Sequence, residues 1–475
     1  MAPLASDWKR SLHSAREVLR AQFMKRPAAS QLLYRHSRLI DRQLAQVWSA
    51  HALPRTWALL AVGGYGRGQL FPYSDIDLLV LLPEPADANV QRKLETFIGT
   101  LWDIGLEVGH SVRTIAECVE LAAQDLTVQT SLLEARLLRG DRALFRRFAS
   151  RLDHAMDPQE FLQAKQLEQQ QRHARYQESN LEPNIKESAG GLRDLQNILW
   201  IARAAGIGKS WGELARRGVV TSEEAREIQR HEVFLQLLRV RLHYLAGRRE
   251  DRLLFDHQSE LARRFGLQDR PNRLASEQLM QRYYRAAKSV SELNAILLQN
   301  LKARVSPSRD KEYHPINPRF GMRDELLEAS RDDLFEREPS AILETFRLLQ
   351  DHHELKGIAA PTLRALWRAR RHINPAFRRD PANRRLFIQI IKSSSHVERA
   401  LRRMNQCGIL GRYLPAFGRI VGQMQHDLYH VYTVDEHILR VIRNLRRFSI
   451  PELAHEFPLC SRLMSNFARP EVLYL

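Results

Sequence analysis

The stretch Trp57–Leu82, which reads WALLAVGGYGRGQLFPYSDIDLLVLL, constrains the fold of this 475-residue chain more than any other part of it. An apolar run of strand length ends at a loop in which four of six residues, GGYGRG, are glycine. A second apolar run, Leu78–Leu82, is typical of a buried strand and follows Asp75 and Asp77. The stretch therefore predicts two strands joined by a loop whose backbone can approach a ligand closely.

The glycine-rich loop is typical of a phosphate-binding turn. Because Gly63, Gly64 and Gly66 have no Cβ, successive backbone amides can form a concave site for phosphate oxygens. We expect these glycines to bind a triphosphate together with Arg67 in the loop and Ser74 after it. The alternative is an ordinary glycine turn between two strands. The paired glycines, the short spacer and the following Asp-x-Asp together favour the functional interpretation.

The pair Asp75 and Asp77 indicates a metal site. Side chains alternate along a strand, so both carboxylates point to the same side. Each carboxylate opposes ionisation of the other, and burial opposes ionisation of both. A divalent cation relieves this cost, and Mg²⁺ prefers a few carboxylates together with substrate phosphate oxygens. The pattern predicts metal-assisted phosphoryl or nucleotidyl transfer, the alternative being a turn pair or a helix cap.

The stretch resembles the nucleotidyltransferase superfamily pattern of a strand, Gly-Gly, a spacer and Asp-x-Asp. Its fuller form, GGYGRGQLFPYSDIDLL, resembles the family of PII-protein uridylyltransferases, also called bifunctional uridylyltransferase/uridylyl-removing enzymes. The resemblance implies an α+β fold, with a small mixed-sheet, polymerase-β-like core followed by mostly α-helical domains. It also implies a third carboxylate on a strand beside the Asp-x-Asp strand, and Glu107 is the best match. Glu107 would orient the metal or act as base toward the nucleophile, the alternative being a surface glutamate.

The formal net charge of +18 comes from arginines spread along the chain rather than from one basic tail. Such a field favours anionic ligands such as nucleotides, an acidic protein surface or nucleic acid. Solvated helix faces in an arginine-rich protein are an equally good explanation. Three widely spaced cysteines indicate neither a disulfide framework nor a zinc site, which fits a reducing cytoplasm. No apolar run approaches the length of a membrane helix, so we expect no membrane partner.

A second motif, LEPNIKESAGGLRDLQNILW from Leu181 to Trp200, resembles the segment that follows the catalytic core in the same family. We expect Lys186 and Arg193 to lie near the phosphates, as a second wall of the nucleotide site. The alternative is a loop between helices with solvated charges. The expected domains are a nucleotidyltransferase domain with N-terminal helices, an associated helical domain, a helical connector and an incomplete HD-type phosphohydrolase domain, at residues 1–150, 151–305, 306–422 and 423–475.

The HD-type assignment depends on His437, which opens the sequence HILRV and resembles the first histidine ligand of that superfamily. The His-Asp dyad is expected a few dozen residues later, beyond Leu475. We therefore expect uridylyl removal to be impaired and the glutamine-sensing ACT domains to be absent. The dipeptide His426-Asp427 precedes the first-ligand match and is not taken as the dyad. His426 and His430 could bind metal together, but a solvated helix face is favoured.

The resemblance implies Mg²⁺-dependent transfer of UMP from UTP to a tyrosine of the PII protein, with release of pyrophosphate. Asp75 and Asp77 would hold the metal, and Glu107 would assist. One alternative is a nucleic-acid-directed nucleotidyltransferase of the tRNA or poly(A) type, which shares the core and would use the positive charge. The second motif argues against it, so nucleic acid is not the expected partner. A non-catalytic nucleotide sensor is the other alternative, and the intact aspartate pair argues against that.

Overall fold

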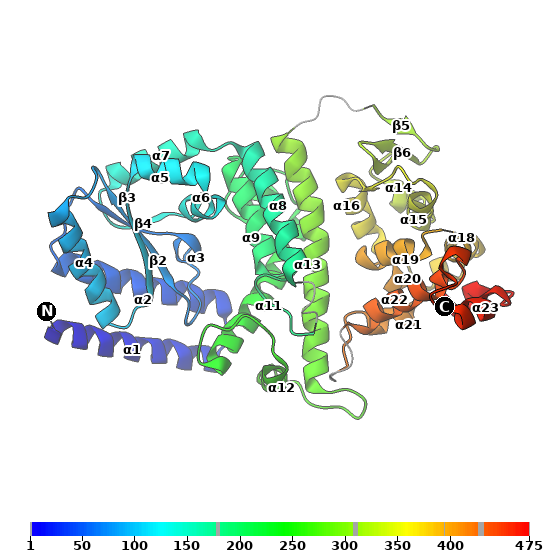
Figure 1. Cartoon of the computed structure of the whole chain (residues 1–475), viewed down its shortest axis with the longest axis horizontal. Coiled ribbons are helices and arrows are strands. Elements are labelled where there is room, and N and C mark those ends of the chain that lie inside the picture. Colours follow the sequence, from blue (N-terminus) through cyan, green and yellow to red (C-terminus); the bar gives the residue numbers. More distant parts are fainter. Residues whose placement is uncertain (1, 177–180, 307–311, 394, 426–431, 475) are drawn as a thin grey trace. The chain divides into compact units, whose positions relative to one another are not determined.

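A computed structural model describes residues 2–176, 181–306, 312–393, 395–425 and 432–474 (Figure 1). The chain divides into two compact units. The first unit comprises residues 1–177 and 184–257, and the second comprises residues 178–183 and 258–475. The first unit combines a mixed sheet with helices, and the second is mostly helical. The fold is therefore α+β, as the sequence predicted, whereas the division into four domains stays a prediction.

The sheet of the first unit has four strands in the order β3-β2-β1-β4. Strand β1 runs antiparallel to both β2 and β4, while β2 and β3 run parallel, so the sheet is mixed. The two central strands are buried, which agrees with the two apolar runs of the glycine-loop stretch. The strands are β1 (Ala58–Ala61), β2 (Ile76–Leu82), β3 (Val108–Thr114) and β4 (Arg136–Gly140).

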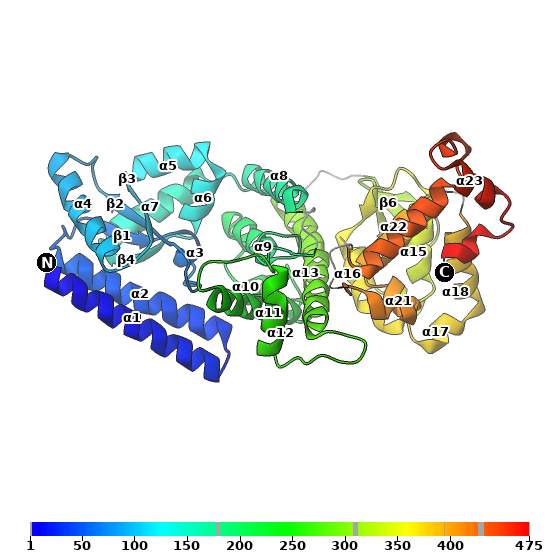
Figure 2. The same cartoon turned by 60° about the horizontal axis from the view of Figure 1, so that its bottom comes forward.

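Helices cover both faces of this sheet. Ile76, Leu78 and Val80 of β2 share a core with α1, α2 and α4, and Figure 2 shows α1 and α2 side by side along that face. Leu79 and Leu81 point the other way, into a core shared with α5 and α7. The helices are α1 (Ala2–Lys25), α2 (Ala29–Ala50), α3 (Gly63–Gly66), α4 (Ala88–Asp103), α5 (Ile115–Gln124), α6 (Leu126–Leu133), α7 (Arg142–Ala155), α8 (Pro158–Tyr176), α9 (Leu192–Ala204), α10 (Trp211–Arg216) and α11 (Ser222–Ala246).

The second unit is built around a helical core, and its C-terminal part carries His437. The sequence predicted a helical connector at residues 306–422, and the structure adds a small sheet of order β5-β6-β7-β8 there. Its strands have two to four residues, too few to show a period of two in the sequence. Its strands are β5 (His314–Pro315), β6 (Phe320–Arg323), β7 (Leu326–Ala329) and β8 (Gly357–Ile358).

Helices make up most of the second unit, and one helix spans the boundary between the units. That helix is α12 (Phe255–Arg264). The others are α13 (Ala275–Val305), α14 (Leu334–Arg337), α15 (Ala341–Asp351), α16 (Ala360–Ala369), α17 (Pro375–Arg379), α18 (Pro381–Lys392), α19 (Val397–Gln406), α20 (Leu410–Tyr413), α21 (Pro415–Ile420), α22 (Val434–Arg447) and α23 (Pro458–Ser465), with short 3₁₀ turns at Arg370–His372, Pro451–Leu453 and Pro470–Tyr474.

Helix α22 places His437 on an exposed surface. Among the described residues, no group of three or more His, Cys, Asp or Glu side chains is arranged to hold a metal ion. The role of His437 as a metal ligand therefore stays a prediction, and His426, Asp427 and His430 lie outside the described residues. None of the described helices has the length and apolar composition needed to cross a membrane.

A buried ionic network in the first unit ties the loop before β2 to α11. The Arg239 guanidinium donates to both carboxylate oxygens of Asp251 at 2.5 and 3.1 Å, and these side chains are 7% and 11% exposed. His243 is fully buried and contacts Asp251 through Nε2 at 3.1 Å and the carbonyl oxygen of Pro72 through Nδ1. Arg239 also lies over the Phe71 ring, 4.0 Å from its centroid. The network therefore holds the loop that leads into Asp75.

Replacing Asp251 by asparagine should destabilise the first unit, because it leaves the buried Arg239 charge unpaired. Breaking a buried pair in this way costs about 3 kcal/mol, which lowers the unfolding midpoint by roughly 6–12 °C in a unit of this size. Differential scanning calorimetry measures the shift. Asp7→Asn is the matched control, because Asp7 and Arg10 form an exposed pair whose loss should cost under about 0.5 kcal/mol. Equal shifts for the two variants would contradict the role of the network.

Candidate active site

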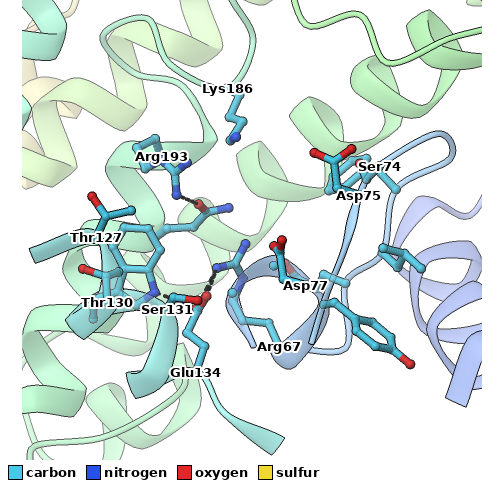
Figure 3. A pocket seen from close by; sticks show the side chains of 18 of the residues that line it. Arg67, Ser74, Asp75, Asp77, Thr127, Thr130, Ser131, Glu134, Lys186 and Arg193 are labelled. Atoms are coloured by element: carbon cyan, nitrogen blue, oxygen red, sulfur yellow. Dashed lines mark hydrogen bonds and ion pairs between the residues drawn. The ribbon is translucent and has the colours of Figure 1, made fainter. Parts of the chain in front are cut away.

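Most of the predicted site residues of the first unit line a cavity of about 280 Å³, and the exceptions are Gly66 and Glu107. Figure 3 shows Asp75 and Asp77 on one side of this cavity, with Thr127, Thr130, Ser131 and Arg193 on the opposite side and Lys186 above them. The structure thus brings together the two sequence motifs, which lie more than a hundred residues apart. The polar lining residues are Arg67, Gln69, Ser74, Asp75, Asp77, Thr127, Thr130, Ser131, Glu134, Lys165, Glu168, Lys186, Arg193, Gln196, Arg239 and Arg249.

The two aspartates stand where β2 begins. Asp77 is the second residue of the strand and lies on the same face as Leu79 and Leu81, so it is partly buried. Asp75 precedes the strand, and half of its side chain is exposed. Burial raises the pKa of Asp77, and the nearby charge of Asp75 raises it further. The pair therefore carries the mutual repulsion that the sequence predicted.

The surroundings of Asp77 fit a divalent cation. Two glycines flank its carboxylate, and a Cβ added at Gly63 or Gly109 would lie 3.1 Å from Oδ2 or Oδ1 respectively. The absence of these side chains leaves both oxygens of Asp77 uncrowded. Two carboxylates that oppose each other's ionisation, with open space around the more buried one, are the hard oxygen donors that Mg²⁺ prefers. The surroundings of this carboxylate therefore fit the Mg²⁺ site that the sequence predicts, and the metal itself stays a prediction.

Arg249 contributes the charge that balances Asp75 in the structure. Its Nη1 donates to Asp75 Oδ2 at 2.6 Å, and both side chains are about half exposed. Arg249 lies between α11 and α12, in the segment that begins with Gly247 at a φ of +67°. The adjacent Arg248 pairs with Glu250 instead. Nothing in the sequence pattern singled out Arg249, because it comes from a distant segment rich in arginine.

The glycine-rich loop forms a single helical turn, α3, packed closely on its neighbours. Gly63 adopts a φ of +55°, which favours glycine. A Cβ at Gly66 would collide with the carbonyl oxygen of Glu134. Gly64 has no such backbone neighbour, since the nearest atom to its Cβ position is Arg67 Nη2 at 3.6 Å. The glycines therefore allow both the turn itself and its close approach to the backbone at the end of α6.

Arg67 is held by a buried carboxylate rather than projecting freely into the cavity. Its Nη1 donates to Glu134 Oε1 at 2.6 Å, and the indole Nε1 of Trp200 donates to the same oxygen at 2.6 Å. Glu134 is only 4% exposed. Three cations surround the Trp200 ring, because Lys165, Arg193 and Arg67 lie 4.6, 5.1 and 5.8 Å from its centroid. The sequence did not indicate a role for Glu134 or Trp200. Their hydrogen bond forms only because α6 and α9 pack against each other in the folded chain.

Lys186 and Arg193 form the cationic wall opposite the aspartates. Lys186 Nζ lies 3.2 Å from Glu187 Oε1, and Arg193 Nη2 donates to the same oxygen at 3.2 Å. Burial, together with the nearby charge of Arg193, lowers the pKa of Lys186 to about 8. The loop is fixed by Asp194, whose fully buried carboxylate accepts from the Gly190 amide at 2.7 Å and from Arg172 Nη2 at 2.7 Å. The second motif thus places two cations at the cavity.

Glu107 does not line the same cavity as the aspartate pair. It precedes β3, its carbonyl accepts from the Ile76 amide at 2.9 Å, and its exposed side chain lines a neighbouring cavity. In the register of β2 and β3, Asp77 lies opposite Gly109, which has no side chain to offer. Ser74 lies on the wall of both cavities. The role of Glu107 as third carboxylate therefore stays a prediction.

Family models match three segments of the chain. A model described as "Nucleotidyltransferase domain" matches residues 52–137, which include the aspartate pair. A model described as "GlnD PII-uridylyltransferase" matches residues 160–298, which include Lys186 and Arg193. A third, "Uridylyltransferase GlnD third domain", matches residues 320–413. The residues that line the cavity all fall within the first two of these matches.

Curated relatives match the chain over nearly its whole length. A bifunctional uridylyltransferase/uridylyl-removing enzyme of Nitrosospira multiformis is 57% identical over 475 residues, covering 98% of this chain and 54% of the relative. Proteins with the same description from Burkholderia thailandensis and Burkholderia pseudomallei are each 52% identical over 476 residues, covering 100% of this chain and 56% of each relative. The chain thus spans about half the length of the curated relatives it matches.

The Arg249–Asp75 pair predicts that Arg249 opposes cation binding. Replacing Arg249 by glutamine removes a positive charge beside the carboxylate pair and should tighten Mn²⁺ binding about three- to tenfold, as expected for partly screened charges near a surface. Electron paramagnetic resonance of free Mn²⁺ measures the affinity. Arg248→Gln is the control, because it removes the same charge one residue away, from a side chain that pairs with Glu250. Equal affinities in the two variants would show that the contact does not oppose the cation.

The lowered pKa of Lys186 predicts that nucleotide affinity weakens as the pH rises through about 8. Lys186 is charged below this pH and loses its proton above it, so its attraction for a triphosphate is lost on the alkaline side. One charge-assisted contact is worth roughly 1.4 kcal/mol, so the dissociation constant should rise about tenfold between pH 7 and pH 9.5. Isothermal titration calorimetry with UTP measures it. Lys186→Arg should abolish most of the rise, and an unchanged pH profile in that variant would refute the assignment.

Proposed function

Since this chain belongs to the family of the bifunctional uridylyltransferase/uridylyl-removing enzymes, we propose that its first unit transfers UMP from UTP to a tyrosine of the PII protein. Pyrophosphate is the second product. The names of the relatives support uridylyl transfer, and the description of the matching family model supports PII as the acceptor. UTP as the donor and tyrosine as the acceptor residue are part of the proposal. The reaction is assigned to the first unit because the cavity lies wholly within it.

One observation carries the proposal: the cavity places a carboxylate pair opposite a cationic wall. Asp75 and Asp77 can hold Mg²⁺, while Lys186 and Arg193 supply positive charge for a triphosphate. Nucleotidyl transfer needs both, because negative charge develops on the phosphoryl oxygens and on the leaving pyrophosphate. A phosphate-binding site without the carboxylates, or a metal site without the cations, would not meet this need.

The mechanism follows from what these residues hold in place. Mg²⁺, when bound by Asp75 and Asp77, supplies Lewis-acid stabilisation of the phosphoryl oxygens. Lys186 and Arg193 bind the triphosphate and orient it for in-line attack. The tyrosine oxygen forms a bond to the α-phosphorus, and the bond from that phosphorus to the pyrophosphate oxygen breaks. Glu107 is the candidate from the sequence for accepting the phenol proton, and because its side chain lines the neighbouring cavity this role stays a prediction.

The buried residues around the cavity serve to keep these groups in place. Glu134 fixes Arg67 and Trp200, and Asp194 fixes the loop that carries Lys186. Trp200 lines the cavity but is only 4% exposed, so its ring supports the three cations that surround it.

The decisive experiment is incorporation of labelled UMP from UTP into purified PII protein in the presence of Mg²⁺. Mass spectrometry should locate UMP on a tyrosine. Asp77→Ala should reduce labelling at least about 100-fold, because it removes one of the two proposed metal ligands. Asp103→Ala, at the exposed end of α4, is the matched control and should label as the unmodified chain does.

The same assay separates the alternatives. Labelling of RNA instead of PII would identify a nucleic-acid-directed nucleotidyltransferase. Such an enzyme would use the formal net charge of +18 to bind the phosphate backbone. Binding of UTP without transfer to either acceptor would identify a nucleotide sensor. Either result would contradict the proposed transfer to PII.

A further inference from the structure

A second cavity, of about 190 Å³, lies beside the proposed active site in the first unit. It is lined by residues of α1 and α2, by the loop before β2, by Glu107 and by Tyr244 of α11. Ser74 belongs to the walls of both cavities. Ser74 and Asp75 are consecutive, so a molecule bound in the second cavity contacts the loop that positions the aspartate pair.

Arg16 brings an uncompensated charge to this cavity. Its Nε is buried and has no hydrogen-bond partner, and its guanidinium forms no ion pair in the part of the chain that the structure describes. The neighbouring Arg20, by contrast, lies 3.8 Å from Glu17 Oε1. Burial lowers the pKa of Arg16, and the charge of Glu107, which lines the same cavity, raises it in part. A half-buried guanidinium without a partner is a group that an anionic ligand would satisfy.

His36 adds an unsatisfied acceptor to the same cavity. It is 6% exposed, and its Nδ1 lies 3.1 Å from the carbonyl oxygen of Leu70. Burial, with the charge of Arg16, lowers its pKa to about 4, so the ring is neutral and Nδ1 donates that bond. The Nε2 atom is then an acceptor, and it is buried without a partner. A ligand that carries a hydrogen-bond donor would satisfy it.

The loop that forms one wall is strained at Tyr73. This residue has a φ of +59°, which is rare for a bulky side chain. Its ring meets the edge of Tyr244, with 6.4 Å between the centroids. Strained residues of this kind cluster at ligand sites and switches. The strain lies directly before Ser74, the residue that the two cavities share.

We propose that this second cavity binds a small anion, a carboxylate or a phosphate that also carries a hydrogen-bond donor, on Arg16 and His36. The anionic group lies against the Arg16 guanidinium, and its donor reaches Nε2 of His36. The bound anion acts on nucleotide affinity through the loop from Tyr73 to Ser74. The regulatory part of the proposal rests on the proposed function, whereas the binding part does not.

Calorimetry of the full chain tests the binding, with Mg²⁺ and saturating α,β-imido-UTP present so that the first cavity is occupied. The probes are inorganic phosphate and glycolate, which both carry a hydroxyl donor, and acetate, which does not. The unmodified chain should bind one phosphate, and glycolate should bind about tenfold more tightly than acetate. Arg16→Gln should weaken phosphate at least about tenfold, and Arg16→Lys should restore part of the affinity.

Arg10→Gln is the matched control, because Arg10 lies on the same helix but pairs with Asp7 at the surface. It should bind phosphate as the unmodified chain does. Unchanged binding in Arg16→Gln, or no binding of phosphate and glycolate by the unmodified chain, would overturn the proposal. Labelling of PII by the same preparations reports on the proposed function separately, so the two can fail independently.

The regulatory part has its own measurement. The dissociation constant of α,β-imido-UTP should change at least about threefold when phosphate saturates the second cavity of the unmodified chain, and should not change in Arg16→Gln. Lys186→Gln shows how much phosphate competes in the first cavity. Equal effects of phosphate on the unmodified chain and on Arg16→Gln would overturn the coupling between the cavities.

Discussion

The rest of the site depends on the electrostatic repulsion between the carboxylates of Asp75 and Asp77, which lie at the start of the buried strand β2. Asp77 is held in β2 by the strand itself, and Asp75 precedes it by two residues on the same side. Burial and the charge of Asp75 both raise the pKa of Asp77. Two ionised carboxylates this close together raise the free energy of the folded chain unless a cation lies beside them. Arg249 partly occupies the position of such a cation in the structure. A divalent cation would fill it more completely.

The surrounding protein is organised to keep this arrangement open and rigid. Glycines on two segments leave space around Asp77, and buried carboxylates hold the groups that face it. Glu134 fixes Arg67, Asp194 fixes the loop of Lys186, and Asp251 fixes Arg239. Each of these acids is largely buried and satisfied by several donors, which is the condition under which a buried charge is tolerated. Lys186 and Arg193 share Glu187 as their counter-charge and line the cavity, where they can serve an anionic ligand.

Much of this organisation could be predicted from local sequence patterns, and the remainder could not, for a physical reason. The glycine-rich loop, the Asp-x-Asp spacing and the apolar runs each involve residues that are close together in the sequence. The two strands and the aspartate pair could therefore be predicted from it. The α+β fold was confirmed as well. Glu134, Trp200 and Arg249 meet only through tertiary packing, and no local period marks them. The strands of the second unit are too short for a period, and the placement of Glu107 depends on strand register.

The central claim is that the cavity of the first unit holds a divalent cation and a nucleoside triphosphate side by side. A crystal structure of the chain with Mn²⁺ and α,β-imido-UTP, using the anomalous signal of manganese, tests it most directly. We expect manganese between the carboxylates of Asp75 and Asp77, with the triphosphate against Lys186 and Arg193. Manganese bound elsewhere, or a nucleotide outside this cavity, would contradict it.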